Sequence, residues 1–465
     1  MRRSLLLALL ALVAWLALAP GVASAAANQA MTFEAPRELI DDGARDATLD
    51  QIKGFGVTRV RQLLSWKTVA PSPNSRSKPS GIDTSDPAAY GAGWGAYDRL
   101  LAAASARGIR VQFTLTGPAP RWATATKDKA GINRPDPREF QRFATAAGRR
   151  FGAQVDTWSV WNEPNQPQFL MPQFRGGAPY SPGLYRRLYR AAVKGIRTDP
   201  SNAQDTVLLG ETSPRGNERI VAPLAFLRGT LCLSRSYRKR KGCGKLDADG
   251  YAHHAYTTSQ GPRFRPSNPD DVTIGVLSRL IKALDKAGKA GAVDRGLGVY
   301  LTEFGTQSYP DKISGVPLAK QAEYYAIAEH IAYLNPRVKL FSQYLMVDDS
   351  PRRSKGNDYG GFESGLRLAD GTAKPAYLAF RLPLTADDYG SSDVLWGRVR
   401  PAAGATSVLL EAKRKSGKWR ELATVQTNST GVFGARTRHV DGQRYRVSWT
   451  SPEGTRFTGP PIRAY

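Results

Sequence analysis

The sequence predicts an α/β fold: a closed (β/α)8 TIM barrel followed by a small C-terminal antiparallel β-sandwich. Eight short strand-like runs alternate with helical patterns over residues 28–383. After Pro383 the helical period disappears, and short runs of alternating apolar and polar residues take over. The length of 465 residues suits a barrel of this kind with an accessory domain and exceeds that of a single small module.

The predicted barrel strands are short, rich in β-branched or aromatic residues, and separated by helical segments. They are centred near Phe33, Val60, Gln112, Trp158, Leu208, Ala252, Tyr300 and Ser342. Between them, apolar residues recur at helical spacing over 94–104, 185–196 and 274–284, and each pattern stops before a glycine or proline. The alternative, a doubly wound sheet, needs a glycine-rich turn after its first strand, but the chain there reads Glu34 to Arg37 without a glycine.

The sequence pattern of residues 388–465 predicts the β-sandwich. Alternation is clearest over Tyr445–Trp449, and turn signals that contain glycine separate six such runs. Two roles are open for this region: a structural cap packed on the barrel, or a module that binds polysaccharide.

Residues 1–25 predict a signal peptide rather than part of the fold. Arg2 and Arg3 precede an apolar run over 5–19, and the small residues 23–25 suit a signal peptidase. The run is shorter than the roughly 20 residues of a membrane-spanning helix, and a retained N-terminal anchor is the alternative. The mature chain is therefore expected to be secreted to the extracellular space, with no membrane span.

The composition is that of a globular protein, with 41% hydrophobic and 23% charged residues, and it excludes a chain that is disordered throughout. Lys and Arg number 66 against 40 Asp and Glu, for a formal net charge of +26. The densest basic run, Arg235–Lys241, lies between the two cysteines, Cys232 and Cys243. In an oxidising compartment this pair predicts a disulfide that closes a short loop; two free thiols or half of a metal site are the alternatives.

The basic run itself has two interpretations. Such runs commonly form a solvated face, and this one is also able to attract an anionic partner such as a cell-wall polymer. Nucleic acid is not an expected partner, because no recognised nucleic-acid module accompanies the run.

Two glutamates follow strands at the end of the barrel where such folds carry their reactive groups. The fourth strand leads into Asn162 and Glu163, and the seventh leads into Glu303. Two carboxylates that face one pocket suit glycosidic cleavage, in which one protonates the leaving oxygen and the other attacks the anomeric carbon or activates water. This chemistry needs no metal or organic cofactor, so neither is expected. The expected partner is an oligo- or polysaccharide substrate.

The segments Trp161–Pro164 and Thr302–Gly305 resemble the signature of the retaining clan A glycoside hydrolases, the group that contains families 5 and 39. The resemblance covers the barrel region, residues 28–383. It implies a glycosidase in which Glu163 is the acid/base and Glu303 the nucleophile. It further implies that Asn162 hydrogen-bonds the 2-hydroxyl of the bound sugar.

The resemblance extends to other strand ends. Arg61 on the second strand matches an arginine that supports the nucleophile, and His254 with Tyr256 on the sixth resembles a His-X-Tyr pair near the glutamates. Because His253 and His254 are adjacent on a strand, at most one of them faces the barrel interior. The stretch 370–377 resembles the segment that closes these barrels after strand eight.

Several positions keep two interpretations. Arg61 either supports the nucleophile or is a buried structural partner for any carboxylate. Glu211, at the end of the fifth strand, either binds sugar or pairs with an arginine. Trp66 and Trp122 follow the second and third strands and are predicted to bind substrate by stacking on a sugar ring, or else to pack in the core. The eighth strand lacks the tryptophan that many clan members place under the sugar, so Tyr344 or Asp348 is expected to line that region.

Two other functions compete with a secreted retaining glycosidase acting on β-linked saccharides. One is a carbohydrate-binding or cell-surface interaction protein on a catalytically weak barrel, but the presence of both glutamates argues against it. The other is a metal-dependent hydrolase. Of the four histidines, only His253 and His254 lie at a strand end, and they do not make a ligand set.

Overall fold

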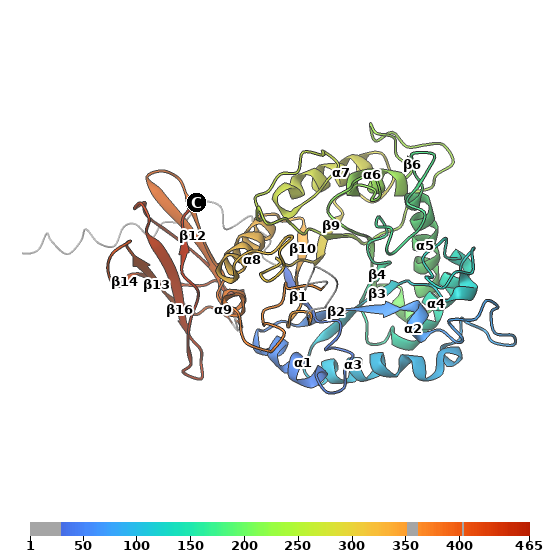
Figure 1. Cartoon of the computed structure of the whole chain (residues 1–465), viewed down its shortest axis with the longest axis horizontal. Helices are drawn as coiled ribbons and strands as arrows, with labels where there is room; N and C mark the ends of the chain where they lie inside the picture. Colours follow the sequence, from blue (N-terminus) through green and yellow to red (C-terminus); the bar gives the residue numbers. More distant parts are fainter. Residues whose placement is uncertain (1–28, 351–360, 402–403) are drawn as a thin grey trace, which may run out of the picture.

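A computed structural model describes residues 29–350, 361–401 and 404–465 of the chain, and its main body is a closed barrel of eight parallel strands (Figure 1). Around the barrel, the strands follow one another in the order β1-β10-β9-β8-β7-β4-β3-β2. Their bounds are β1 (Ala30–Glu34), β2 (Arg59–Ser65), β3 (Arg110–Thr116), β4 (Thr157–Val160), β7 (Thr206–Thr212), β8 (Gly250–His254), β9 (Gly298–Glu303) and β10 (Val338–Tyr344). All eight predicted strands are confirmed, since each predicted centre falls inside one of these ranges.

Helices cover the outside of the barrel (Figure 1). They are α1 (Arg45–Gly54), α2 (Trp66–Val69), α3 (Gly95–Ser105), α4 (Pro137–Phe151), α5 (Ser181–Ile196), α6 (Pro223–Thr230), α7 (Leu277–Lys289), α8 (Leu318–Tyr333) and α9 (Pro375–Arg381). Short 3-10 helices are η1 (Pro87–Trp94), η2 (Arg121–Ala123), η3 (Pro200–Asn202) and η4 (Ile274–Val276). A two-stranded hairpin, β5 (Phe174–Arg175) and β6 (Ala178–Pro179), lies between β4 and α5.

Local sequence explains where these helices begin and end. At α4 the side chain of Asp136 accepts a hydrogen bond from the backbone N of Arg138, and Pro137 occupies the first turn, where its missing N–H costs nothing. The predicted helix over 274–284 begins as η4 and continues as α7. Past α3, Gly108 adopts a left-handed φ of 70°, which favours glycine where a chain leaves a helix.

The C-terminal region is an antiparallel β-sandwich, as predicted. One sheet has the order β11-β12-β15, and the other has the order β14-β13-β16-β17, with β18 also pairing with β16. Their bounds are β11 (Leu384–Asp388), β12 (Ser392–Arg398), β13 (Ser407–Lys413), β14 (Arg420–Gln426), β15 (Val432–Arg438), β16 (Arg444–Thr450), β17 (Arg456–Thr458) and β18 (Ile462–Arg463). The first strand begins four residues before the predicted boundary at 388. Over the described residues the region has more strands than the six predicted, because β17 and β18 are too short to show alternation.

The sandwich is docked against α8 of the barrel. Glu329 of α8 is fully buried, and its carboxylate accepts hydrogen bonds from Arg398, at 3.1 Å, and from Arg400. Beside it, the ring of His330 stacks on Trp396 of β12, with the ring centroids 4.6 Å apart. A buried carboxylate shared by two arginines holds the sheet in one orientation. This packing is the one expected of a structural cap, and it leaves open whether the sandwich also binds polysaccharide.

The docking contact predicts a stability effect. Replacing Arg398 with methionine is expected to lower the free energy of unfolding by about 2 kcal/mol, because Glu329 keeps Arg400 but loses one charged hydrogen bond. Urea denaturation of the variant measures the loss. Exposed Arg436 on β15 provides the control, R436M, which is expected to change stability by less than about 0.5 kcal/mol. Equal effects of the two changes would contradict the assignment of a stabilising interface.

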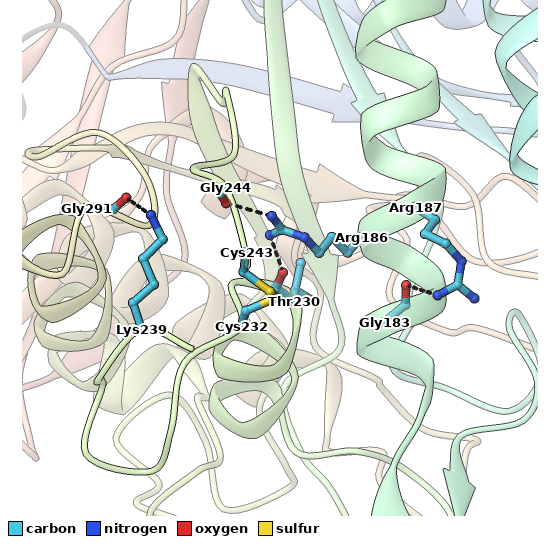
Figure 2. Close-up of a disulfide and its surroundings, with 9 residues drawn as sticks. All are labelled: Gly183, Arg186, Arg187, Thr230, Cys232, Lys239, Cys243, Gly244 and Gly291. Atoms are coloured by element: carbon cyan, nitrogen blue, oxygen red, sulfur yellow. Dashed lines mark hydrogen bonds between the residues drawn. A yellow bond between two sulfur atoms is a disulfide. The ribbon is translucent and has the colours of Figure 1, made fainter. Parts of the chain in front are cut away.

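The predicted disulfide between Cys232 and Cys243 is present, with the two Cα atoms 6.2 Å apart. Beside it, the guanidinium of Arg186 donates hydrogen bonds to the carbonyl oxygens of Thr230 and Gly244, at 2.9 and 2.7 Å (Figure 2). The predicted signal peptide lies outside the described residues. Of the helices that the structure describes, none combines the length and hydropathy needed to span a membrane.

Candidate active site

Five barrel strands bring charged side chains to one end of the barrel. Glu34, His254 and Glu303 are the last residues of β1, β8 and β9, while Glu211 lies one residue from the end of β7 and Glu163 follows β4. Since the strands are parallel, their carboxyl ends meet at a single mouth. The backbone conformation at the strand ends then directs these side chains towards the barrel axis.

Non-glycine residues with a left-handed backbone concentrate at this end of the barrel. Trp161, Glu163 and Glu211 have φ angles of 63°, 38° and 50°. Such strain persists where surrounding packing holds it in place, and functional sites are where it is commonly found. The indole of Trp161 is one such support: it is fully buried, and a Cβ on Gly117 would lie 2.5 Å from it, so only glycine allows this close approach.

The two glutamates predicted to be catalytic lie together. One carboxylate oxygen of Glu163, one of Glu303 and a ring nitrogen of His254 all lie within 4.8 Å of one another. The Nδ1 atom of His254 is 3.0 Å from Oε1 of Glu163 and 3.3 Å from Oε2 of Glu303. Both glutamates are nearly buried, at 8% and 7% exposed, which leaves each a small accessible surface at the barrel mouth.

Arg61 lies beneath these groups and is fully buried. Its Nη1 donates to Glu34 at 2.6 Å and to Glu303 at 2.8 Å, and its Nη2 donates to Glu211 at 2.8 Å and to Asn162 Oδ1 at 3.0 Å. The guanidinium therefore fixes one oxygen of each of three carboxylates, as well as the amide of Asn162. Its contact with Glu303 is the one that the resemblance implies.

Glu211 pairs with cations rather than facing open space. Its Oε2 lies 2.8 Å from Arg61 Nη2 and 2.6 Å from His254 Nε2. Burial opposes ionisation of this carboxyl, but Arg61 and His254 outweigh it and hold the pKa of Glu211 at about 2. Of the two interpretations of Glu211, the structure favours the pairing with an arginine.

The two adjacent histidines face opposite sides of β8. His254 points into the site, where burial opposes its charge but Glu303, Glu163 and Glu211 raise its pKa to about 10. His253 points away, with Nδ1 2.9 Å from Thr212 Oγ1 and Nε2 2.8 Å from the carbonyl of Val272. Burial lowers the pKa of His253 to about 4. His254 is therefore an imidazolium at neutral pH and His253 is a neutral ring.

Two neutral side chains, Tyr256 and Gln166, complete the contacts to the catalytic glutamates. The hydroxyl of Tyr256 donates to Glu303 Oε2 at 3.1 Å, so that Arg61 and Tyr256 hold its two oxygens. Gln166 Nε2 donates to Glu163 Oε2 at 2.8 Å. Burial raises the pKa of Glu163, while the hydrogen bond from His254 acts in the opposite direction. A carboxyl that keeps its proton more strongly than usual is suited to general acid catalysis.

Sequence reasoning missed Glu34 and Gln166. Glu34 was detectable by the rule that found Glu303, since it also ends a barrel strand. Burial raises the pKa of Glu34 to about 8, with Arg61 opposing and Glu303 reinforcing the shift. Gln166 had no such signal, because it reaches Glu163 through the turn that follows β4.

Glu34 predicts a pH-dependent stability difference. A carboxyl whose pKa is raised from 4.5 to about 8 contributes stability below pH 4.5 that is lost as the pH rises through 8. Glutamine resembles the protonated form, so E34Q is expected to match the wild type near pH 5 and to exceed its stability by about 4 kcal/mol at pH 9. Urea denaturation at both pH values checks this; a variant that is destabilised equally at both would contradict it.

The prediction that Trp66 and Trp122 bind sugar is wrong. Trp66 is fully buried and Trp122 is 4% exposed, with their ring centroids 6.2 Å apart. Helix α4 covers Trp66, whose ring lies 5.4 Å from Phe140 and 5.7 Å from Phe143. A ring without accessible faces cannot stack on a sugar, so both tryptophans pack in the core, which was the alternative.

Of the two residues expected near the eighth strand, Tyr344 lines the site and Asp348 does not. The ring of Tyr344 is half-buried and lies 6.3 Å from Tyr256 and 5.3 Å from exposed Phe362. Asp348 forms a buried ion pair with Lys374, at 2.7 Å. Tyr344 is therefore the aromatic side chain that β10 supplies to the mouth.

Among the residues that the structure describes, two groups of side chains have the donor types of a metal site: Glu163, His254 and Glu303 in the barrel, and Asp388, Asp393 and His439 in the sandwich. In the barrel His254 already hydrogen-bonds Glu163, and the guanidinium of Arg61 lies 2.8 Å from Glu303. In the sandwich, His439 Nδ1 is 2.8 Å from Asp393. A fixed positive charge beside Glu303 disfavours a cation at the barrel group.

Comparison with known proteins gives one partial sequence match and extensive structural matches. No family model matches the chain. A curated β-glucosidase from an Agrobacterium species is 30% identical over 119 residues, which span 25% of this chain and 22% of the relative's own length. The GH39 enzyme of Xanthomonas axonopodis pv. citri superposes with a TM-score of 0.51 at 16% identity, covering 90% of this chain and 92% of that one.

A monomeric β-xylosidase of Caulobacter crescentus has the same TM-score, 0.51, at 15% identity, and covers 93% of this chain and 96% of that one. At such identities the likeness is one of fold, and activity has to be argued from the site. The chain has the (β/α)8 barrel fold of these solved glycoside hydrolases, so its resemblance to clan A is confirmed at the level of the fold.

Proposed function

We propose that the chain is a retaining glycoside hydrolase that cleaves O-glycosidic, β-linked bonds of a saccharide by double displacement. The observation that carries the proposal is the approach of Glu163 and Glu303, whose nearest side-chain oxygens lie within 4.8 Å at the barrel mouth. Carboxyl groups about 5 to 5.5 Å apart accompany retention, whereas inverting enzymes separate them by roughly 6.5 to 9.5 Å to admit a water molecule. The short separation supports the retaining mechanism.

In the first step, a Glu303 oxygen attacks the anomeric carbon while Glu163 donates its proton to the departing glycosidic oxygen. The bond between the sugars breaks, and a covalent bond joins the sugar to Glu303. Arg61 and Tyr256 hold the two Glu303 oxygens, at 2.8 and 3.1 Å, which orients the carboxylate for attack. Burial favours the protonated form of Glu163 that this step uses, because it raises the pKa of that carboxyl.

In the second step, ionised Glu163 takes a proton from water, and the resulting hydroxide displaces Glu303 from the anomeric carbon. Both residues return to their starting protonation states. Asn162 is placed to hold the sugar during both steps: its Oδ1 accepts from Arg61, and its Nδ2 has no acceptor in the described parts of the chain. That amide nitrogen is the donor assigned to the sugar 2-hydroxyl.

Glu303→Ala tests the proposal. The variant is expected to lose roughly 10⁴-fold or more in kcat on an activated aryl β-glycoside, because the nucleophile is removed. Azide or formate is expected to restore turnover and to give a product of inverted anomeric configuration, since a small anion then attacks from the vacated side. A panel of aryl β-glycosides and polysaccharides identifies the substrate for the assay.

Exposed Glu218 supplies the matched control, and E218A is expected to retain full activity. Undiminished turnover by E303A would refute the assignment. Binding of glycans by the wild type without turnover would instead favour a carbohydrate-binding protein on a catalytically weak barrel. Loss of activity with EDTA would favour the metal-dependent alternative.

Export from the cell is part of the proposed function and rests on the leader-like pattern of residues 1–25. Sequencing the N-terminus of the mature protein tests it: a start near residue 26 in the culture medium supports export. An intact Met1 in the cell fraction contradicts it.

A further inference from the structure

The disulfide-closed segment 232–243 lies at the end of the barrel opposite the glutamates. It connects α6 to the first residues of β8, whereas His254 ends that strand at the catalytic mouth. The chain that follows the segment hydrogen-bonds the beginning of a neighbouring strand, because the N–H of Asp249 donates to the carbonyl of Val207 in β7. The length of the barrel therefore separates this segment from the proposed catalytic residues.

The segment is a compact hairpin rather than an open loop. The N–H of Ser234 donates to the carbonyl of Arg238, and the N–H of Arg240 donates to the carbonyl of Cys232, both at 2.9 Å. Between these bonds, Leu233 and Lys239 form an antiparallel bridge. The disulfide joins the residue at the start of the hairpin to the chain just past its end.

Side-chain packing fixes the hairpin to the barrel. Leu233 is 2% exposed, and the ring of Tyr237 packs against the hydrophobic core with Arg228 and Lys286 over it, 5.7 and 5.3 Å from its centroid. Arg186 of α5 donates hydrogen bonds to the carbonyls of Thr230 and Gly244, which lie on either side of the hairpin (Figure 2). Because the hairpin backbone is held in place, its side chains lose little conformational freedom when they bind a ligand.

The hairpin is entirely basic in its charged residues. The exposed basic side chains include Arg235, Arg238, Arg240 and Lys241. Within the described ranges, none of these four has a carboxylate within ion-pair distance. The fifth basic residue, Lys239, donates a hydrogen bond from Nζ to the Gly291 carbonyl at 3.1 Å (Figure 2). Nearby acidic groups are already engaged. Asp247 and Asp249 pair with Arg197, and Asp294 pairs with Lys245.

We propose that this basic hairpin is a non-catalytic anchoring site for an anionic polysaccharide built from uronic acid units. Such a polymer repeats carboxylates along a flexible chain, and several of them can neutralise neighbouring guanidinium and ammonium groups at once. The choice of a polysaccharide rests on the proposed function, since the proposed substrate of the barrel is itself a sugar chain. Anchoring keeps the barrel mouth close to further segments of the same polymer, through a raised effective concentration.

Binding of fluorescein-labelled polygalacturonate to the full mature chain tests the anchor, with anisotropy measured from about 50 to about 300 mM NaCl. The variant R235Q/R238Q/R240Q/K241Q is expected to raise Kd about tenfold at the lower salt concentrations. It is also expected to flatten the dependence of log Kd on log salt, because fewer counterions are released. Its turnover of a neutral aryl glycoside is expected to equal that of the wild type.

The sandwich offers a control with the same loss of charge. Arg414, Lys415, Lys418 and Arg420 are exposed around the turn from β13 to β14, and R414Q/K415Q/K418Q/R420Q is expected to change Kd by less than about twofold. Equal weakening by both variants shows attraction to net charge alone and overturns the proposal, as does an unchanged Kd for the hairpin variant. Tighter hairpin-dependent binding of polyglycerol phosphate or of polyuridylate overturns the choice of a uronate polymer.

These outcomes are separable from failure of the proposed function. If no glycoside is turned over by the wild type, the glycosidase assignment fails, while the difference in Kd between the two variants still measures the anchor. If E303A behaves as proposed and the hairpin variant binds as the wild type does, the anchor alone fails.

Discussion

Replacing Arg61 with methionine is expected to lower the free energy of unfolding by about 3 to 5 kcal/mol and to abolish measurable turnover. The guanidinium is fully buried and donates to Glu34, Glu211 and Glu303. Without it, carboxylates remain in a dry site with no arginine to balance them. The orientation of Glu303 is lost at the same time. Urea denaturation and kcat/KM on an aryl glycoside measure the two effects.

A double-mutant cycle identifies the cause of the loss. Glu211 is held ionised by Arg61 and His254, with a pKa of about 2, so R61M/E211Q is expected to recover about 2 kcal/mol of the stability that R61M loses. Arg187, which is exposed and donates to the Gly183 carbonyl within α5, serves as the control through R187M. If R61M and R187M are equally stable, the buried charge network has no energetic role.

Because of His254, the free energy of unfolding is expected to fall as the pH rises from neutral to alkaline values. The pKa of this histidine is raised from 6.5 to about 10, so its contribution is fully present below pH 6.5 and is lost as the pH rises through 10. The contribution is on the order of 4 kcal/mol. H254Q is therefore expected to be less stable than the wild type by this amount at pH 6, and the gap is expected to close near pH 10.

Urea denaturation of both proteins across pH 6 to about 10 measures the gap. His253 provides an internal comparison, because burial lowers its pKa to about 4 and it is already neutral over this range. H253Q is therefore expected to show a gap that does not change with pH in this window. A constant gap for H254Q as well would mean that His254 acts through packing rather than charge.

Much of the fold could be predicted from the sequence because its signals are local. Each barrel strand is a short β-rich run that ends where a helical pattern or a turn begins, and all eight centres fall within strands of the structure. Strand ends in a parallel barrel meet at one mouth, so the order of elements was enough to place Glu163 and Glu303 together. The short strands β17 and β18 escaped prediction because they carry too few residues to show a period.

The side chains around the site were less predictable. Trp66 and Glu34 both stand at or just beyond a strand end, yet α4 covers the tryptophan and the barrel mouth receives the glutamate. Whether a side chain at such a position reaches the mouth depends on which helix packs over it. That contact joins residues more than 70 positions apart in the case of Trp66 and Phe140, and no local pattern records it.

By itself, the sequence determined the alternation of strands and helices, the change to a sandwich, and the positions of two glutamates at strand ends. Tertiary structure alone decided that Arg61 contacts three carboxylates, that His254 links Glu163 to Glu211, and that α8 docks the sandwich. The physical reason is the separation along the sequence between the residues that interact. Hydrophobic periodicity and turn chemistry act over a few residues, whereas charge networks and buried aromatic clusters arise from side chains that meet only after the barrel has closed.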